Sequence, residues 1–188
     1  KIGFSVGGVE DAVLGSILKG AGLSLADVEL VNVNWSLSPA LMAGQVDAVI
    51  GAYRNFELNQ MQIEGRPGHC FAVEEVGVPI YDELIYLANP ATMDAGRTAR
   101  FLRATARAAA FIAADPQAGW ESFASYAPEL RDDLNTRAWG DTLPHFAADP
   151  TAFDAERYAA FAAFMADSGL IPAGQTADDL TVQLEAAQ

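Results

Sequence analysis

The first 90 residues alternate between short apolar runs and helical spacing of apolar positions. The runs KIGFSV, VELVNVN and VDAVIGA, which start at residues 1, 28 and 46, predict strands. Apolar residues recur at helical spacing over residues 9–19, and glycines follow where that helix should end. The stretch SPALMAG predicts a short helix with Ser38 as its N-cap and Pro39 at its first position. This βαβαβ order predicts a parallel sheet with right-handed crossovers.

The hydrophobic pattern changes near Pro90. Before it, the runs CFAV at 70–73 and ELIYLA at 83–88 are candidates for two more strands. After it, strand patterns stop, and alanine-rich helical spacing predicts helices. These helices cover residues 97–114, 117–126, 128–138 and 154–169. We therefore expect an α/β part over residues 1–90 and a helical segment over residues 91–188.

The predicted helices carry more large apolar side chains than a small sheet can cover. The set comprises Phe101, Phe111, Ile112, Trp120, Phe123, Phe161 and Phe164. A sheet already faced by its own helices offers them too little surface. The chain also begins inside a strand pattern at Lys1, without an initiator methionine. We expect a processed or truncated chain whose helices pack on a missing lobe or on a partner chain.

The composition of the chain makes several classes of function unfavourable. The chain has 188 residues, of which 51% are apolar and 19% charged, as in ordered globular proteins. Its 11 Lys and Arg against 25 Asp and Glu give a formal charge of -14, which disfavours nucleic acid and anionic lipid as partners. The single Cys70 excludes an internal disulfide, and two histidines, His69 and His145, are too few for a metal site. We expect no metal, no cofactor and no catalytic residue.

Polar and aromatic groups follow each of the three predicted strands. In an open parallel sheet, ligands bind beyond the carboxyl ends of the strands. The stretches SVGGVED, NWSLSP and GAYRNFE, which start at residues 5, 34 and 51, should therefore meet at one edge. In the first of them, Ser5, Gly7 and Gly8 form either an anion cradle or a plain tight turn. Acidic residues at positions 10 and 11 would repel an anion, so a neutral polar ligand fits this turn better.

Trp35 and Glu57 are the strongest candidates for ligand recognition. Trp35 is either a wedge in the core or a flat stacking surface for a ring. Glu57 is either a solvated carboxylate at a helix start, a partner of Arg54, or an acceptor for the N–C–NH₂ edge of a ligand. With Tyr53 and Phe56 close by in the sequence, the last alternative describes a receptor for a flat, amino-bearing heterocycle.

Three motifs carry a resemblance to a known family. They are ALMAGQVDAVIG, YRNFELNQM and GVPIYDEL, which start at residues 40, 53 and 77. Together residues 1–90 resemble the second lobe of bacterial ABC-transporter substrate-binding proteins for thiamine pyrimidine precursors, which are similar in fold to fungal pyrimidine synthases. The first motif is shared by many substrate-binding proteins, whereas the other two are typical of the pyrimidine-precursor group. The helical remainder resembles these proteins more loosely.

The resemblance implies a periplasmic-binding-protein type II lobe over residues 1–90. The C-terminal helices would return to a first lobe whose N-terminal part is absent. It implies the solute-binding component of an ABC importer, periplasmic or extracellular, lipid-anchored or soluble, which docks on a membrane permease. The ligand would be hydroxymethylpyrimidine or formylaminopyrimidine, held in an interlobe cleft. Glu57 would take its amino edge, Trp35 or Tyr53 would stack near the ring, and Ser5, Gly7, Gly8 and Asn55 would offer polar contacts.

Two other functions stay open at the level of sequence. The first is a pyrimidine synthase on the same scaffold, whose chemistry in the family involves histidine and a cysteine-rich motif that this chain lacks. The second is a receptor for another flat solute, such as a riboflavin precursor or an aromatic sulfonate. Acidic residues near the expected cleft disfavour the sulfonate.

Overall fold

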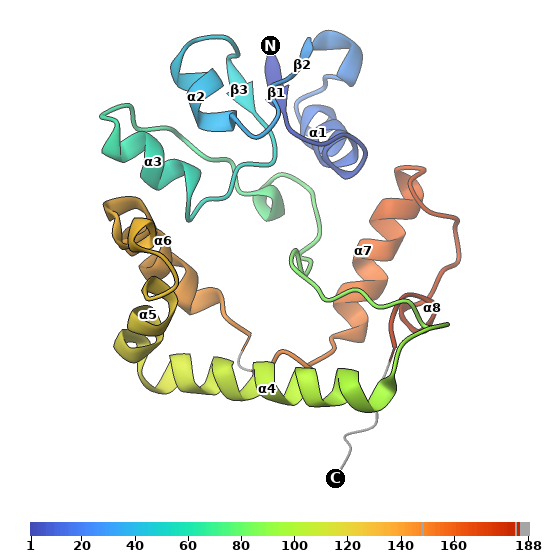
Figure 1. Ribbon diagram of the computed structural model, residues 1–188. Helices are drawn as coiled ribbons and strands as arrows, with labels where there is room; N and C mark the ends of the chain where they lie inside the picture. Colours follow the sequence, from blue (N-terminus) through green and yellow to red (C-terminus); the bar gives the residue numbers. More distant parts are fainter. Residues whose placement is uncertain (148, 183, 185–188) are drawn as a thin grey trace. The chain divides into compact units, whose positions relative to one another are not determined.

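The computed structural model describes residues 1–147, 149–182 and 184, with the backbone alone at residues 9 and 10 (Figure 1). The chain forms two compact units. The N-terminal unit comprises Lys1–Tyr81 and Arg157–Gln175, and the second unit comprises Asp82–Glu156 and Thr176–Gln188. Residues 157–175 thus belong with the α/β part, although they follow the expected boundary at residue 90. The assignment of the two parts to lobes of a binding protein stays a prediction.

A small parallel sheet forms the centre of the N-terminal unit. Its strands are β1 (Ile2–Phe4), β2 (Leu30–Asn32) and β3 (Ala48–Val49), in the order β2-β1-β3. Both neighbours run parallel to β1. The predicted βαβαβ unit with a parallel sheet is therefore confirmed, although each strand is shorter than its apolar run.

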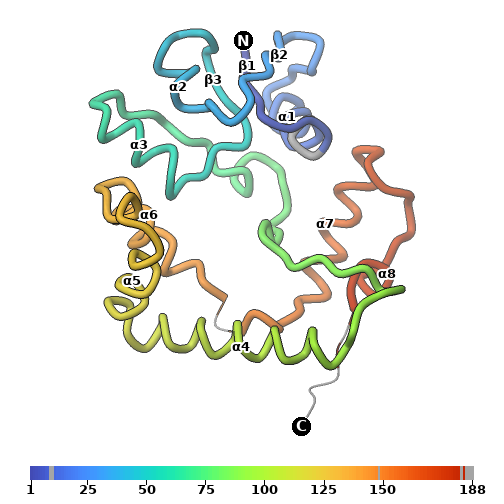
Figure 2. Tube along the Cα trace, viewed as in Figure 1, coloured from blue at the N-terminus to red at the C-terminus, as the bar shows by residue number. Residues whose placement is uncertain are grey.

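Four helices belong wholly or mostly to the N-terminal unit. They are α1 (Val9–Gly20), α2 (Leu37–Met42), α3 (Glu57–Ile63) and α7 (Ala155–Asp167). Helix α1 buries Val13, Leu14 and Leu18, three of the four apolar positions that predicted it; the fourth, Ile17, is half-buried. Helix α2 contacts β1 and β3, and the tube in Figure 2 shows α1 and α2 flanking the strands. The core of this unit lies between these helices and the sheet.

The predicted start of α2 is wrong by two residues. Ser36 is the N-cap, and Leu37 is the first helical residue. Ser38 lies inside the helix, is 2% exposed, and its Oγ has no hydrogen-bond partner among the described residues. Pro39 is thus the third helical residue, where the absent N–H would have had no intrahelical partner in any case.

The two additional strands predicted at 70–73 and 83–88 are also wrong. Residues 70–72 are irregular and lead into a 3-10 helix, Val73–Glu75, whereas residues 83–88 contain neither helix nor strand. Leu84 and Leu87 in the second segment are 83% and 87% exposed. An apolar run becomes a strand only where a neighbouring strand completes its hydrogen bonds, and none pairs with either run in the described residues.

The second unit is helical. Its helices are α4 (Ala95–Ala114), α5 (Pro116–Ala124), α6 (Asp133–Thr142) and the short α8 (Ala177–Leu180). Three further 3-10 helices span Leu25–Asp27, Pro128–Arg131 and Leu143–His145, the first of them in the N-terminal unit. The expected helix over 128–138 is split because Asp132 accepts a hydrogen bond from Asn135 N at 2.7 Å and starts a new helix there.

The molecule therefore has an α/β fold with a small parallel sheet and many helices. None of the helices in residues 1–147 and 149–182 has the length and apolarity needed to cross a membrane. Several aromatic side chains of the second unit stay open to solvent, as the excess of apolar residues led us to expect. Phe101 and Phe111 are each about half exposed, and Phe123 is 38% exposed.

Candidate functional site

Glu57 is the first residue of α3, and its carboxylate is held by the turn that precedes the helix. Tyr53 N donates a hydrogen bond to Glu57 Oε2 at 2.7 Å, and Glu57 N donates to Tyr53 O at 3.0 Å. A carboxylate can accept several hydrogen bonds. The contact with Tyr53 therefore fixes the direction of the group and leaves it capacity for a ligand donor.

Arg54 forms its ion pair with a residue other than Glu57. Its Nη1 lies 2.8 Å from Glu74 Oε1, on the 3-10 helix Val73–Glu75. This hydrogen bond raises the pKa of Arg54. A hydrogen bond from its own backbone N–H, together with the one from Arg54, lowers the pKa of the Glu74 carboxyl. Of the alternatives for Glu57, pairing with Arg54 thus has no support in the structure.

Two aromatic rings border the turn that carries Glu57. Tyr53 is 41% exposed and Phe56 is 38% exposed. Asn55, between them, is half-buried, and its backbone oxygen accepts a hydrogen bond from Asn59 Nδ2 at 3.0 Å. Asn59 is itself buried in α3, so the turn is anchored to the helix. The segment YRNFE therefore carries one oriented carboxylate and two partly exposed aromatic residues.

Trp35 lies at the tip of the turn after β2. Asn34 adopts a positive φ of 52°, and its N–H donates to Asn32 Oδ1 at 2.8 Å, which closes the turn. Trp35 is 82% exposed, so it is not a core wedge of the N-terminal unit. Its role as a stacking surface stays a prediction.

The turn after β1 uses its own acidic residue as a cap. Gly8 has a φ of 97°, which favours glycine, and Gly8 N donates to Asp11 Oδ2 at 3.1 Å. One N–H of the expected cradle is thereby satisfied within the chain, which agrees with the argument against an anionic ligand. The side chain of Glu10 lies outside the described residues. Polar contacts of Ser5, Gly7 and Gly8 with a ligand stay predictions.

A pocket of about 520 Å³ lies between β2 and α2 in the N-terminal unit. Its lining is Val31, Asn32, Val33, Asn34, Ser36, Pro39, Ala40, Ala43 and Gln45. Neither Glu57 nor Trp35 belongs to this lining, although Trp35 lies between two residues that do. The polar side chains of Asn32 and Gln45 were not singled out from the sequence. The signal for Asn32 was present, because asparagine interrupts the apolar run VELVNVN.

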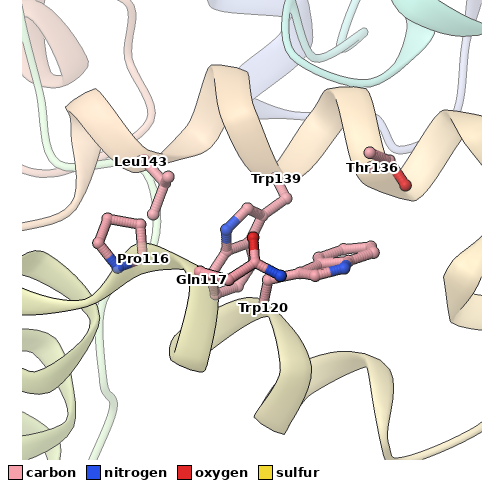
Figure 3. Close-up of a pocket in the computed structure, with 6 residues that line it drawn as sticks. All are labelled: Pro116, Gln117, Trp120, Thr136, Trp139 and Leu143. Carbon is pink, nitrogen blue, oxygen red and sulfur yellow. The ribbon is translucent and has the colours of Figure 1, made fainter.

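A second pocket, of about 280 Å³, lies in the second unit between α5 and α6 (Figure 3). Figure 3 shows Trp120 and Trp139 reaching from the two helices into the same space, with Gln117 beside them. The ring centroids of Trp120 and Trp139 are 5.8 Å apart, and Trp139 stacks on Phe123 at 5.6 Å. Trp139 thus packs at a helix junction.

Comparison with known proteins assigns the chain to a family. A family model described as NMT1/THI5-like matches residues 1–119, which is more than half of the sequence. The chain belongs to the NMT1/THI5-like family. The resemblance based on the motifs around residues 40, 53 and 77 is thereby confirmed at the level of the family.

The chain is also similar to individual proteins of different organisms. A protein of Haemophilus influenzae that is named for thiamine biosynthesis is 50% identical over 186 residues. The formylaminopyrimidine-binding protein of Halalkalibacterium halodurans is 33% identical over 86 residues, or 46% of this chain. The 4-amino-5-hydroxymethyl-2-methylpyrimidine phosphate synthase of Aspergillus parasiticus is 24% identical over 161 residues, or 79% of this chain.

The chain matches only part of each relative. The match covers 98% of this chain but 59% of the Haemophilus influenzae protein. It covers 26% of the formylaminopyrimidine-binding protein and 46% of the Aspergillus parasiticus synthase.

In residues 1–147, 149–182 and 184, no group of three or more metal-ligating side chains comes together.

Proposed function

We propose that this chain is the larger part of a solute-binding protein for a thiamine pyrimidine precursor. The ligand is hydroxymethylpyrimidine or formylaminopyrimidine, bound without chemical conversion. Support comes from membership of the NMT1/THI5-like family and from the relative named for binding formylaminopyrimidine. The observation that carries the proposal is the Tyr53–Glu57 hydrogen bond, which orients a carboxylate beside two partly exposed aromatic rings.

Recognition follows from the chemistry of these groups. An aminopyrimidine presents a ring nitrogen next to an exocyclic amino group, and a carboxylate can accept paired hydrogen bonds from such an edge when the ring nitrogen is protonated. Tyr53 or Trp35 would offer a face for stacking, which is tolerant of substituents on the ring. Ser5, Gly7, Gly8 and Asn55 would add polar contacts from neighbouring strand ends. A neutral or weakly basic ring suits this acidic chain better than a phosphate does.

The wider role we propose is that of an ABC importer's receptor. The N-terminal unit would be one lobe of a type II periplasmic binding protein, and the exposed helices of the second unit would pack on the other lobe. The lobes would close on the ligand by hinge bending, and the closed form would dock on a membrane permease. This role places the protein in the periplasm or outside the cell, soluble or lipid-anchored.

A synthase is the second candidate, because the Aspergillus parasiticus relative carries that name. The composition argues against it, since one cysteine and two histidines leave few groups for the family's chemistry. Incubation of the protein with pyridoxal phosphate and iron, followed by mass spectrometry for a pyrimidine product, separates the two. A product would replace the receptor proposal.

Titration calorimetry of the Glu57→Gln variant tests the receptor proposal. The probes are hydroxymethylpyrimidine and formylaminopyrimidine, added to the protein that contains both lobes. Loss of a charged hydrogen bond, about 1.5–3 kcal/mol, should weaken binding by more than tenfold. The control is Glu64→Gln, at the other end of α3, which should bind like the wild type. Affinity equal to that of the wild type in both variants would mean that Glu57 only holds the turn before α3 through Tyr53 N.

A further inference from the structure

Two of the points at which the chain passes between its two units lie near one aromatic stack, and a further one follows Gln175. The chain leaves the N-terminal unit after Tyr81 and returns to it at Arg157, close to the start of α7. The rings of Tyr81 and Phe161 stack with centroids 4.3 Å apart and planes 12° from parallel. Phe164, one turn further along α7, continues the stack at 5.7 Å from Phe161. Two segments far apart in sequence are therefore joined where the chain leaves and re-enters this unit.

The segment that leads to Tyr81 is anchored step by step to the N-terminal unit. Val78 is 3% exposed, and its N–H donates to Val73 O at 3.1 Å. Ser16 Oγ of α1 donates to the backbone oxygen of Gly77 at 3.3 Å. Beyond Val78, the side chain of Ile80 is 66% exposed. Val78 is thus the last buried residue of this segment, and the stacking of Tyr81 on Phe161 is what attaches the end of the segment to the unit.

The residues that follow Tyr81 are far more exposed than the part of α7 on which Tyr81 stacks. Residues 83–88 lack helix and strand, and Leu84, Ile85, Tyr86 and Leu87 are each at least half exposed. In α7, where the chain has returned to the N-terminal unit, Ala162 next to Phe161 is 6% exposed. This part of α7 is therefore packed against other residues. The stack therefore stands at the boundary between packed structure and an open connecting segment.

We propose that the Tyr81–Phe161 stack is a clamp that fixes the end of the N-terminal unit. It makes the outgoing segment and the middle of α7 move as one piece, so that rearrangement of the outgoing connection takes place in residues 83–90. Aromatic pairs of this kind contribute beyond the area that they bury. If the protein closes on a ligand, the clamp sets where the hinge begins; this last step alone rests on the proposed function.

Hydrogen exchange measured by mass spectrometry tests the clamp without any ligand. Tyr81→Leu and Phe161→Leu remove a ring but keep apolar bulk, so each variant should fold. Either variant should speed exchange both at residues 78–82 and at residues 157–164, roughly two- to tenfold, the factor that loss of one aromatic pair corresponds to. Acceleration confined to the mutated segment would show that the two segments are not coupled and would overturn the proposal.

Two controls separate the stack from other roles of Tyr81. Tyr81→Phe keeps the ring and removes the hydroxyl, so its exchange should match the wild type; acceleration as large as in Tyr81→Leu would assign the anchoring to the hydroxyl. Tyr86→Leu removes a comparable ring, which packs on Phe101 in the second unit at 5.0 Å. It should leave residues 157–164 unchanged. Failure of pyrimidine binding would count against the receptor proposal and leave this result intact.

Discussion

At the residue scale, Gly3 shows how closely the small sheet is packed. It lies in the central strand, where a Cβ would stand 3.2 Å from Val46 Cγ2 and Val49 Cγ1 and 3.3 Å from Val33 Cγ2. These valines come from the neighbouring segments, and they fill the space that a side chain at Gly3 would need. In the part of the chain that the structure describes, the sheet has three short strands, so this contact is a large share of its packing.

Gly3→Ala should lower the free energy of unfolding by about 1–3 kcal/mol, the usual range for an overpacked core. Gly15→Ala is the matched control, because in the described residues no heavy atom beyond the adjoining helix backbone lies within 4 Å of the added Cβ, and the residue is inside α1. There, alanine should raise stability by about 0.5–1 kcal/mol. Denaturant unfolding of both variants measures whether the free energy of unfolding falls for Gly3→Ala and rises for Gly15→Ala. Equal effects would mean that the valines around Gly3 move aside freely.

The Arg54–Glu74 ion pair should make the free energy of unfolding depend on pH in the acidic range. The pKa of Glu74 lies below its usual value of 4.5 in the folded chain. Its stabilising effect is therefore complete above that value and is lost as the pH falls through the lower, folded-state pKa. Because the pair is partly exposed, we expect only about 0.2–1 kcal/mol. Wild type and Glu74→Gln should differ by that amount near neutral pH and converge in acid.

Unfolding curves collected between neutral pH and strong acid measure this difference. Glu75→Gln, one residue further along the chain, is the control, and it should shift stability less than Glu74→Gln does. A difference between wild type and Glu74→Gln that persists unchanged in acid would rule out the ion pair as its source.

At the element scale, the break between α4 and α5 depends on one residue. Asp115 ends α4 and is the N-cap of α5, where its Oδ1 accepts a hydrogen bond from Ala118 N at 3.0 Å. Pro116 follows at the first position of α5 and cannot continue the previous helix. Both signals are local, which is why this boundary was predicted correctly from the sequence.

Asp115→Ala should destabilise the second unit by about 0.5–2 kcal/mol, because the cap bond to Ala118 N is lost. Asp115→Asn keeps a side-chain oxygen in place and should stay close to the wild type. Thermal unfolding followed by tryptophan fluorescence reports on this, since Trp120 lies in α5. If the asparagine variant were as unstable as the alanine variant, the negative charge and not the hydrogen bond would be responsible.

Elements that depend on distant partners could not be predicted in the same way. The apolar run at residues 83–88 has the composition of a strand, but strand formation needs a neighbour that the pattern does not reveal. The start of α2 was misplaced because Ser36 and Ser38 are equally good caps by residue type. Only the packing of Ser38 in the interior distinguishes them.

At the scale of the whole molecule, the candidate site also combines features that local sequence predicts with features that depend on distant residues. The position of Glu57 at a helix start followed from the pattern, whereas its hydrogen bond to Tyr53 N required the turn geometry. Pairing of Arg54 with Glu74, 20 residues along the chain, could not be read from sequence spacing. Whether Trp35 and Glu57 contact the same ligand depends on the cleft of the proposed two-lobed protein and stays a prediction.

Charge and exposed apolar surface act against each other in the whole chain. The formal charge of -14 repels other copies, whereas Phe101, Phe111 and Tyr126 offer exposed rings that favour contact. Salt at 0.1 M screens the repulsion between charges more than about 10 Å apart and leaves the apolar attraction in place. We therefore expect this chain to stay monomeric at low ionic strength and to associate as salt is added.

Light scattering after gel filtration, over a series of sodium chloride concentrations, measures this association. Lowering the pH toward the isoelectric point of about 4.3 removes the same repulsion by protonation and should also promote association. Tyr126→Ser is the informative variant, because this ring is 91% exposed and its removal should weaken association with little effect on folding. Association that falls with added salt would indicate contacts between opposite charges instead, since screening weakens attraction between unlike charges and leaves apolar attraction in place.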